Sequence, residues 1–317
     1  MSVLHLTEAD VAHVLTMDLA LDAVTAAFRK LSLDEAMNPP RQRVQTEKVF
    51  LHVLPASAKT LGALGFKAYT VGPGGTQFKI YLFDPKQGGL TAIVDAGWLG
   101  QVRTGAASGV ATKKLARADA SVVGLYGSGG QAGTQLQAVC KVRNIRKAFV
   151  YARNEYKLAA FAEQMSRVCE IEVVPATEPR QAAEGCDIVI TATTAREPVL
   201  HGEWLAPGTH LNLVGSNFLV KAEADAEVFR DAVVTVDSKE QARLEAGDFV
   251  APMEAGLLSW SDVNEFAHVL TGRYPGRESS TDRTIFKSLG LGVEDIAVAV
   301  QVVELARAAG LGTTLPL

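Results

Sequence analysis

A glycine-rich stretch has the residue types and spacing of a dinucleotide-binding turn: Gly127-Ser128-Gly129-Gly130-Gln131-Ala132. It follows the apolar run Val122–Tyr126 and precedes a helical pattern over 134–139. Gly127 allows a tight turn, Gly129 lets the backbone approach a pyrophosphate, and Ala132 lets the helix pack closely on the strand. Because free N–H groups at a helix start face phosphates, we expect the motif, Gly130 and Gln131 included, to bind a cofactor. The alternative is a glycine-rich turn in another α/β domain.

The end of the next expected strand indicates which nicotinamide cofactor is bound. NAD sites usually place Asp or Glu there, about 20 residues after the glycines, to bind the ribose 2′-hydroxyl. Here the chain reads Tyr151-Ala152-Arg153-Asn154. Arg153 could pair with a 2′-phosphate and Asn154 could donate a hydrogen bond, which favours NADPH. Glu155 lies close enough to keep NADH as the alternative, and Arg153 could also be a plain surface residue.

Residues at helix and strand ends suit the same cofactor. Thr104, near a helix start, is a natural phosphate-binding or capping hydroxyl. Thr193 follows one expected strand and Val214 ends another, and ligands of open α/β sheets bind at the carboxyl ends of strands. The sequence offers little support for a hydrolase or a metal site, because no nucleophile or metal-ligand spacing accompanies its histidines, which include His52, His201, His210 and His268.

A parallel sheet must position these residues. From about Ala120 the chain alternates between strand and helix, which predicts an α/β fold with a Rossmann-type, doubly wound sheet. The expected strands are Val122–Tyr126, Ala148–Tyr151, Ile171–Val174, Ile188–Thr191, His210–Val214 and Val233–Val236. We place this dinucleotide-binding domain at residues 118–292.

Residues 1–117 read as a second α/β domain. Helical spacing covers Leu21–Leu31 and Ala106–Ala116, and strand-like runs occur at Val49–Val53, Leu64–Tyr69 and Lys79–Phe83. An apolar helix from Val293 to Ala309 could return to this domain, so we assign 293–317 to it.

Composition excludes several classes of partner. The chain has 317 residues and a net charge of −4 without a basic run, so two domains are expected and a nucleic-acid partner is not. It lacks an apolar run of about 20 residues and a secretory start, so we expect no membrane segment. Its three cysteines show no metal spacing and fit free thiols in the cytoplasm.

Four ordered motifs together resemble the ornithine cyclodeaminase/μ-crystallin family. They are 103–108, 127–135, 215–217 with Lys221 and Glu223 after it, and 286–290 with Glu294 and Asp295 after it. The resemblance spans nearly the whole chain and implies a homodimer with a Rossmann domain and a separate substrate-binding and dimerisation domain. The family includes ornithine cyclodeaminases, alanine dehydrogenases, ketimine reductases and cofactor-binding lens crystallins, so it indicates the cofactor class better than the substrate.

The resemblance also implies roles for three cationic residues that the sequence alone would suggest are ordinary surface residues. Arg41 and Lys67 match the family's substrate-binding Arg and Lys, and Arg103 matches an Arg between cofactor phosphate and substrate. Arginine suits a small imino or amino acid because its planar fork can bind both oxygens of a carboxylate. Lys67 could instead supply a proton. Lys221 matches a family lysine and Ser288 lies where the family approaches the nicotinamide, so we expect both at the cofactor.

The chain departs from the family at Asn217, where cyclodeaminases and the archaeal alanine dehydrogenase carry an aspartate. An amide is not a general acid or base, although it can hold a substrate nitrogen or a water. Ornithine cyclisation needs several proton transfers, whereas reduction of a preformed imine needs fewer. We therefore expect NADPH-linked reduction of Δ1-pyrroline-2-carboxylate or Δ1-piperideine-2-carboxylate to L-proline or L-pipecolate, with Lys67 and Asn217 as catalytic candidates. The alternatives are an ornithine cyclodeaminase or amino-acid dehydrogenase, and a cofactor-dependent binding protein with little turnover.

Overall fold

The computed structural model describes residues 2–316, which form two compact units. The first unit contains the chain up to Arg103 and from Gly290 onward, and the second contains Thr104–Leu289. The C-terminal helix therefore belongs to the same unit as the N-terminal part of the chain. The units change over within helix α3 (Gly97–Leu115) and just before α9 (Gly292–Ala308). The functional division at 117/118 and 292/293 stays a prediction.

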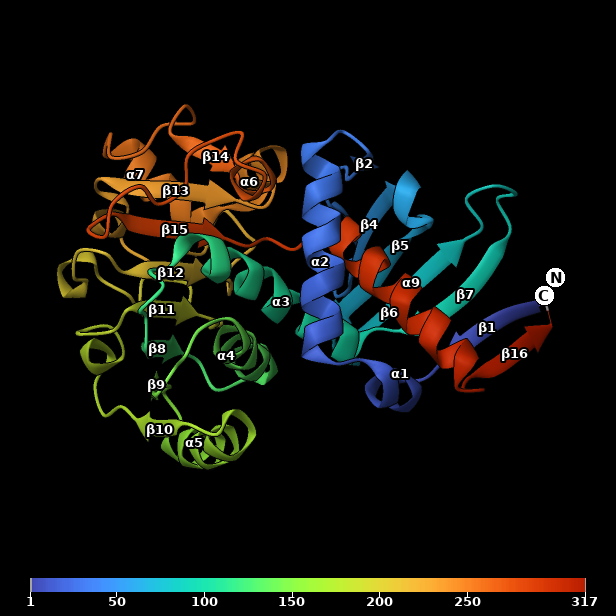
Figure 1. Cartoon of the computed structure of the whole chain (residues 1–317), viewed down its shortest axis with the longest axis horizontal. Helices are drawn as coiled ribbons and strands as arrows, with labels where there is room; N and C mark the ends of the chain where they lie inside the picture. Colours follow the sequence, from blue (N-terminus) through green and yellow to red (C-terminus); the bar gives the residue numbers. More distant parts are fainter. Residues whose placement is uncertain (1, 317) are drawn as a thin grey trace. The chain divides into compact units, whose positions relative to one another are not determined.

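The first unit is an eight-stranded mixed sheet with helices on one face. The strand order is β16-β1-β7-β6-β5-β4-β2, with β3 beside β4, and all pairs are antiparallel except β1 with β7. α9 packs on β4, β5 and β6 and lies beside α2 (Figure 1). The elements are β1 (Ser2–Leu6), α1 (Glu8–Val14), α2 (Met17–Ser32), β2 (Ala36–Met37), β3 (Gln42–Gln45), β4 (Phe50–Ala58), η1 (Lys59–Leu61), β5 (Ala63–Gly72), β6 (Gly75–Phe83), β7 (Leu90–Asp95), α9 and β16 (Thr313–Pro316).

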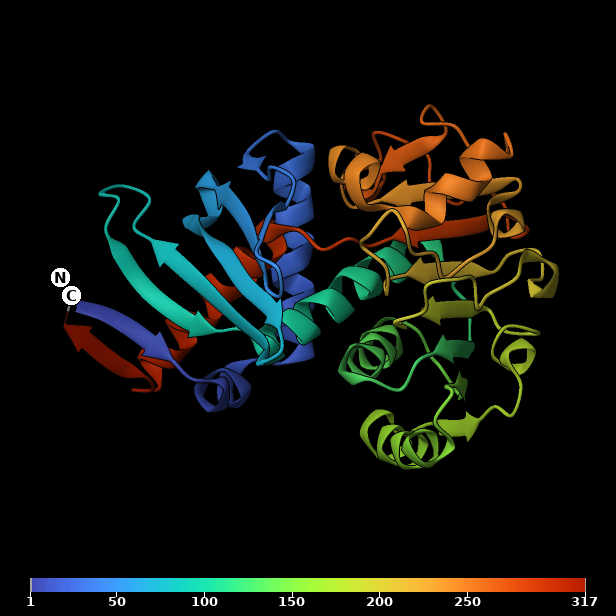
Figure 2. The same cartoon turned by 180° about the vertical axis from the view of Figure 1, so that it is seen from behind.

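Side chains of β5 alternate between the two faces of this sheet. Ala63, Gly65 and Lys67 are buried, whereas Leu64 and Phe66 are half-exposed. Successive strand residues point to opposite faces, so the buried set lies on the side covered by α9. Figure 2, the view from behind, shows the strands in front of both helices. Lys67 is therefore a charged residue on the core side of a sheet.

The second unit contains an all-parallel sheet in the order β10-β9-β8-β11-β12-β15-β13-β14. The strands are β8 (Val122–Tyr126), β9 (Lys147–Tyr151), β10 (Glu172–Pro175), β11 (Ile188–Thr191), β12 (His210–Leu213), β13 (Ala232–Val236), β14 (Val263–Glu265) and β15 (Arg283–Lys287). The helices are α4 (Gly130–Val142), α5 (Glu155–Cys169), α6 (Lys239–Glu245), α7 (Val250–Glu254) and α8 (Phe266–Leu270), with short 3-10 turns η2 (Pro179–Ala182), η3 (Gly202–Trp204), η4 (Ala226–Phe229) and η5 (Gly247–Phe249).

Apolar cores on both faces of this sheet confirm the doubly wound fold class. On β8, Leu125 packs with Leu136 of α4 and Phe161 of α5, whereas Tyr126 packs with Phe229 in a separate cluster. The chain order reverses between β8 and β11, which makes the carboxyl ends of these strands a topological switch point.

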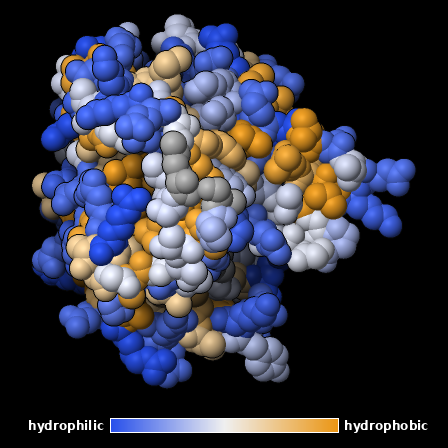
Figure 3. Space-filling view, turned by 90° about the vertical axis from the view of Figure 1, so that its right-hand side faces the viewer, coloured by the Kyte–Doolittle hydropathy of each residue, from blue (hydrophilic) through white to orange (hydrophobic). Residues whose placement is uncertain are grey.

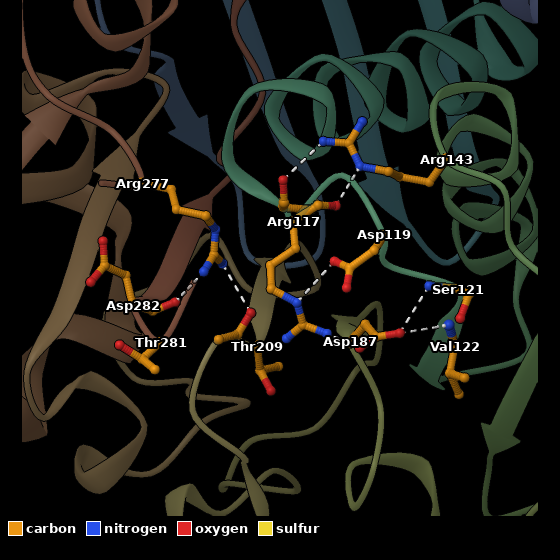
Figure 4. Close-up of polar contacts among 12 residues, drawn as sticks. Arg117, Asp119, Ser121, Val122, Arg143, Asp187, Thr209, Arg277, Thr281 and Asp282 are labelled. Atoms are coloured by element: carbon orange, nitrogen blue, oxygen red, sulfur yellow. Dashed lines mark hydrogen bonds and ion pairs between the residues drawn. The ribbon is translucent and has the colours of Figure 1, made fainter. Parts of the chain in front are cut away.

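The amino ends of the same strands are closed by arginines (Figure 4). Arg117 forms an ion pair with Asp187, whose other oxygen accepts the backbone N–H groups of residues 121 and 122. Arg143 donates to the carbonyl oxygens of Thr112 and Ala116 at the end of α3, at 3.0 and 2.9 Å. Because the last carbonyls of a helix have no partner within the helix, Arg143 stabilises this end of α3.

Among residues 2–316, no single helix is long and apolar enough to cross a membrane; the α1–α2 pair, bent by 90°, meets the test by length and composition only. Cys140, Cys169 and Cys186 are free thiols, as expected.

Candidate functional site

The turn before α4 has the geometry of a phosphate-binding loop. Gly127 has a φ of +112°, and a Cβ there would overlap the carbonyl oxygen of Ala192. Gly129 is the exposed N-cap residue of α4, and a Cβ there would meet no atom within 4 Å. Ala132 is fully buried in the core between α4 and the sheet. The open side at Gly129, next to the exposed Gly130 and the start of α4, fits a pyrophosphate.

A cavity of about 420 Å³ adjoins this turn at the carboxyl ends of β8, β9 and β11. Its lining comprises residues 126–129, 151–154, 157, 192–195 and 199, so it includes Arg153, Asn154 and Thr193 as expected. Two cations, Arg153 and Lys157, belong to this lining, which within the described chain contains no Asp or Glu. The side-chain oxygen of Asn154 accepts the N–H of Lys157 at 3.0 Å and caps α5, which leaves its amide group as the hydrogen-bond donor.

Two buried polar atoms, one at the start of α4 and one directly after β15, could bind a ligand. Gln131 Oε1 and Ser288 Oγ are buried and have no hydrogen-bond partner among residues 2–316. Buried polar atoms usually have a partner. Both residues were expected at the cofactor, and both have capacity for a further hydrogen bond.

A carboxylate, Glu223, joins the loops that leave β11 and β12. Its Oε1 accepts the N–H and hydroxyl of Thr193, both at 2.7 Å, and its Oε2 accepts the hydroxyl of Thr191 at 2.9 Å and the N–H of Gly215 at 2.6 Å. Burial raises the pKa of Glu223, as does the nearby Asp248, whereas Lys287 and the bonds from Thr193 lower it.

Asp248 and Lys287 complete this buried network. Lys287 Nζ lies 2.8 Å from Asp248 Oδ2 and donates to the carbonyl oxygen of Ser216 at 2.7 Å. Asp248 Oδ1 accepts the backbone N–H of Glu223 at 2.6 Å. The network thus fixes the loop that carries Asn217, the catalytic candidate of this unit.

The remaining expected cofactor residues of the second unit lie on α3 and near the strand ends. Thr104 lies inside α3, which begins at Gly97, so its expected position near a helix start was wrong. Its carbonyl oxygen accepts Gln135 Nε2 at 3.0 Å, which ties α3 to α4. Val214 is half-buried directly after β12. Lys221 Nζ lies 5.2 Å from the centre of the Phe218 ring, in the loop that contains Asn217. A cofactor contact for these residues stays a prediction.

In the first unit the three expected substrate cations form one buried ionic cluster. Lys67 Nζ lies 3.0 Å from Asp295 Oδ1, and Arg103 Nε lies 2.8 Å from the same oxygen. Arg103 also binds Glu294 at 2.8 Å, and Arg41 donates to the carbonyl oxygen of Gly290 at 3.3 Å. Arg41, Lys67 and Arg103 are at most 7% exposed. The interactions seen for Arg103 lie in this cluster, and its contact with a cofactor phosphate stays a prediction.

Lys67 and Arg103 each keep N–H donors beyond those that bind Asp295 and Glu294. Cationic donors gathered in a buried place are suited to an anionic ligand such as a carboxylate. Burial lowers the pKa of Lys67 to about 8, with the Coulomb attraction of Asp295 opposing the shift and the nearby Arg103 and Arg41 adding to it. Lys67 is therefore mostly protonated at neutral pH, yet is far more acidic than an ordinary lysine.

Aromatic rings lie beside the Lys67 amine. Its Nζ is 5.8 Å from the centre of the Tyr69 ring and 5.3 Å from that of Phe78. Tyr69 in turn stacks on His52, with ring centres 4.3 Å apart and planes 4° from parallel. Burial lowers the pKa of His52 to about 4, and Arg43 and Arg41 add to that shift, so this imidazole is neutral at pH 7.

Residue-by-residue reasoning missed the acids and aromatics around these sites. Glu294, Asp295 and Glu223 were noted only as parts of motifs, and Asp248, Tyr69 and Phe78 were not singled out. The sequence carries a signal for one pair: Glu294 and Asp295 are adjacent acids in the first turn of a helix whose next residues, 296–300, are all apolar, and both are fully buried. Among the described residues, no group of three or more His, Cys, Asp or Glu could hold a metal ion.

The profile of the ornithine cyclodeaminase/mu-crystallin family matches residues 2–310. The chain belongs to this family. An alanine dehydrogenase from Archaeoglobus fulgidus is 35% identical over 324 residues, covering 99% of this chain and 98% of that protein.

Two solved structures of the ornithine cyclodeaminase/mu-crystallin family match the whole fold. Thermococcus litoralis Δ1-pyrroline-2-carboxylate reductase, in complex with NADH and L-proline, superposes with a TM-score of 0.94 at 38% identity, covering 98% of this chain and 100% of that one. An archaeal alanine dehydrogenase dimer with bound NAD gives a TM-score of 0.94 at 34% identity, with 100% of both chains covered. The family and fold class expected from the sequence are thus confirmed.

Proposed function

We propose that this protein reduces small cyclic ketimines that carry a carboxylate, Δ1-pyrroline-2-carboxylate and Δ1-piperideine-2-carboxylate first, to L-proline and L-pipecolate. The chain is an NAD(P)-dependent oxidoreductase of its family, and a small-molecule imino or amino acid is its substrate class. The choice of a cyclic imine rests on the residues of the first unit.

The observation that carries the proposal is the pair of buried cations, Lys67 and Arg103, that share one oxygen of Asp295. Both keep N–H donors that their printed partners do not use, and these can bind the oxygens of a substrate carboxylate. The Tyr69 and Phe78 rings beside the amine offer apolar surface on which the ring of a cyclic imine can pack. The T. litoralis relative is a Δ1-pyrroline-2-carboxylate reductase solved in complex with NADH and L-proline, and the A. fulgidus relative is an alanine dehydrogenase.

The residues have distinct parts in the proposed reaction. A reduced nicotinamide, when bound, supplies a hydride to the imine carbon. The cationic cluster holds the carboxylate, and such positioning matters because misplacement by about 1 Å can cost about a hundredfold in rate. Lys67, with a pKa of about 8, can give a proton to the imine nitrogen at neutral pH. Asn217 can hold the nitrogen or a water without titrating.

We propose NADPH as the preferred cofactor, with NADH as the alternative. The cavity lined by Arg153 and Lys157, with no acid among its described residues, favours a 2′-phosphate over a 2′-hydroxyl. The two family structures contain NADH and NAD, which supports a nicotinamide cofactor without deciding between the two forms.

An amino-acid dehydrogenase is the second candidate function, because the curated relatives and the solved structures that match both include an archaeal alanine dehydrogenase. Oxidation of an amino acid also needs a carboxylate site and a nicotinamide, so the same residues serve it. Ornithine cyclisation is less well supported, since Asn217 replaces the aspartate expected for its proton transfers.

We also propose that the protein is a homodimer through the uncovered face of the first unit's sheet. Three rings gather there and remain partly exposed: Phe66 stacks on Tyr81, with ring centres 4.8 Å apart, and lies 6.0 Å from the ring centre of Phe83. Apolar side chains gather in several places on the side of the molecule seen in Figure 3. An archaeal relative is described as a dimer. Light scattering tests this: a Tyr81→Asp variant should be monomeric, and a monomeric wild type would contradict it.

One assay tests the proposed reaction. Three separate reactions are compared. The purified protein is mixed with NADPH or NADH and pyrroline-2-carboxylate, with NADPH or NADH and pyruvate plus ammonia or methylamine, and with NAD and ornithine. We expect the fastest cofactor oxidation with the cyclic imine. Ammonia release from ornithine, or faster turnover of pyruvate with ammonia, would overturn the substrate assignment. Tight NADPH binding without turnover would indicate a binding protein instead.

A further inference from the structure

We propose that Glu223 is a positioning residue of the nucleotide crevice, holding the two loops after β11 and β12 at the separation that the nicotinamide half of the cofactor requires. This inference rests on the proposed cofactor site of the second unit. It does not depend on which imine or amino acid is the substrate.

The Glu223 carboxylate is saturated by donors from both loops. Oε1 accepts two bonds from Thr193, and Oε2 accepts one from Thr191 and one from Gly215, all between 2.6 and 2.9 Å. β11 and β12 are neighbouring parallel strands, with Thr191 paired to Leu213. The side chain therefore links the two strands just beyond the point where their own hydrogen bonds stop.

Both oxygens must be acceptors. Each oxygen receives one backbone N–H, from Thr193 or from Gly215, and a backbone N–H cannot turn round to accept. A glutamine of the same shape would place its NH2 group against one of these N–H groups. The position therefore needs a carboxylate, although a neutral amide would fill the same space.

The surroundings leave the carboxylate little room to move. A Cβ on Gly215 would overlap both Glu223 Oε1 and the carbonyl oxygen of Thr193. On the backbone side, Asp248 accepts the N–H of Glu223, and the Glu223 carbonyl oxygen accepts the N–H groups of residues 199 and 200 at 2.8 and 3.0 Å. Lys287 fixes Asp248 in turn.

The loops that Glu223 joins belong to the crevice. Thr193 lines the 420 Å³ cavity next to the glycine turn. Gly215 begins the segment that contains Asn217 and follows β12, one strand farther from β8 than β11. Since ligands of such sheets lie over the carboxyl strand ends, a dinucleotide whose adenosine fills the cavity extends its other half toward these two loops.

The test separates the two halves of the cofactor. Calorimetry compares NADPH with adenosine 2′,5′-bisphosphate, its adenosine half, on wild type, Glu223→Gln and the control Glu245→Gln, which changes a buried glutamate on α6. In Glu223→Gln we expect NADPH to bind about tenfold more weakly, because the donor–donor contact pushes the two loops apart and the cofactor must restore their spacing against it. Binding of the bisphosphate should change less than twofold, and Glu245→Gln should bind both as wild type does.

Other outcomes overturn the inference. Equal NADPH affinity in Glu223→Gln and wild type would sink it, and equal losses for both ligands would show a purely structural role. If Glu223→Gln does not fold, Thr191→Val provides the test, since it removes one hydroxyl donor without adding another. It should weaken the binding of NADPH but not that of the bisphosphate, and unchanged NADPH binding in this variant would contradict the inference. A wild type that binds NADPH but reduces no imine would refute the proposed reaction and leave this inference standing, whereas a wild type that binds neither NADPH nor NADH would refute both.

Discussion

One oxygen of Asp295 accepts both Lys67 Nζ, at 3.0 Å, and Arg103 Nε, at 2.8 Å. The Lys67 and Asp295 side chains are 4% and 0% exposed, so this carboxylate and not water sets the position of both cations. Asp295 Oδ2 is buried and has no hydrogen-bond partner among residues 2–316. Two cations on one acid leave each with donors to spare, which is what a substrate carboxylate needs.

Replacing Lys67 by methionine should impair catalysis strongly without destabilising the fold. Arg103 still binds both Glu294 and Asp295 in the variant, so neither buried carboxylate loses its last cation, and an apolar side chain in place of a buried ion is often neutral or stabilising. We expect kcat/KM for the cyclic imine to fall about a hundredfold or more, the loss for a charged hydrogen bond of up to about 3 kcal/mol. Tm should stay level or rise. Lys59→Met, at an exposed position, is the control; a large fall in Tm for Lys67→Met alone would contradict the charge argument.

The alkaline limb of the pH–rate profile should follow Lys67. Because its pKa is about 8 and the protonated amine is the active form, kcat/KM should decline as pH rises through that value. Asp295 opposes the lowering of this pKa, so Asp295→Asn should move the limb to lower pH. The free energy of unfolding should change in the opposite direction with pH. Between pH 8 and 10.5 the folded protein has lost the Lys67 proton while the unfolded chain still holds it, so the contribution of Lys67 to the free energy of unfolding rises over this range. If the pH–rate profiles of wild type and Asp295→Asn have the same alkaline limb, Lys67 is not the titrating group.

The sequence predicts the second unit better than the first. Val122–Tyr126 and Ile188–Thr191 match β8 and β11 residue for residue, because buried parallel strands read as continuous apolar runs. β15 was missed since charged residues stand at both of its ends, Arg283 and Lys287. The helix expected over Ala106–Ala116 begins at Gly97, where small residues give no apolar period.

The sequence does not predict the parts of the site whose chemistry depends on ion pairs or hydrogen bonds between distant residues. Asp295 lies 228 residues from Lys67 along the chain, and spacing cannot relate the two. The family resemblance identified the cations Arg41, Lys67 and Arg103, but not the acids that hold them. The same holds for Glu223, whose four donors come from two strand ends and become neighbours only in the folded sheet.

Two alanine substitutions should separate the fold of the glycine turn from its function. Gly127→Ala is strained twice, by a φ of +112° and by overlap with the Ala192 carbonyl, so we expect a loss of about 1–3 kcal/mol in stability and no NADPH binding. Gly129→Ala has ordinary backbone angles and open space, so Tm should barely change. Its methyl group would occupy the side where we expect the pyrophosphate, so NADPH affinity should still fall. Thermal unfolding and calorimetry measure both effects, and full NADPH affinity in Gly129→Ala would place the pyrophosphate elsewhere.

The last prediction concerns the choice of cofactor. Arg153 is exposed at the end of β9 and lines the cavity with Lys157, so a 2′-phosphate there would meet two cations, whereas a 2′-hydroxyl would meet no carboxylate of the described lining. Arg153→Ala should weaken NADPH by about 10- to 100-fold, the range for a charge-assisted hydrogen bond, and NADH by less than about threefold. Arg146→Ala, an exposed arginine at the other end of the same strand, should change neither. Dissociation constants from fluorescence titration decide the matter, and equal losses for the two cofactors in Arg153→Ala would remove the argument for NADPH.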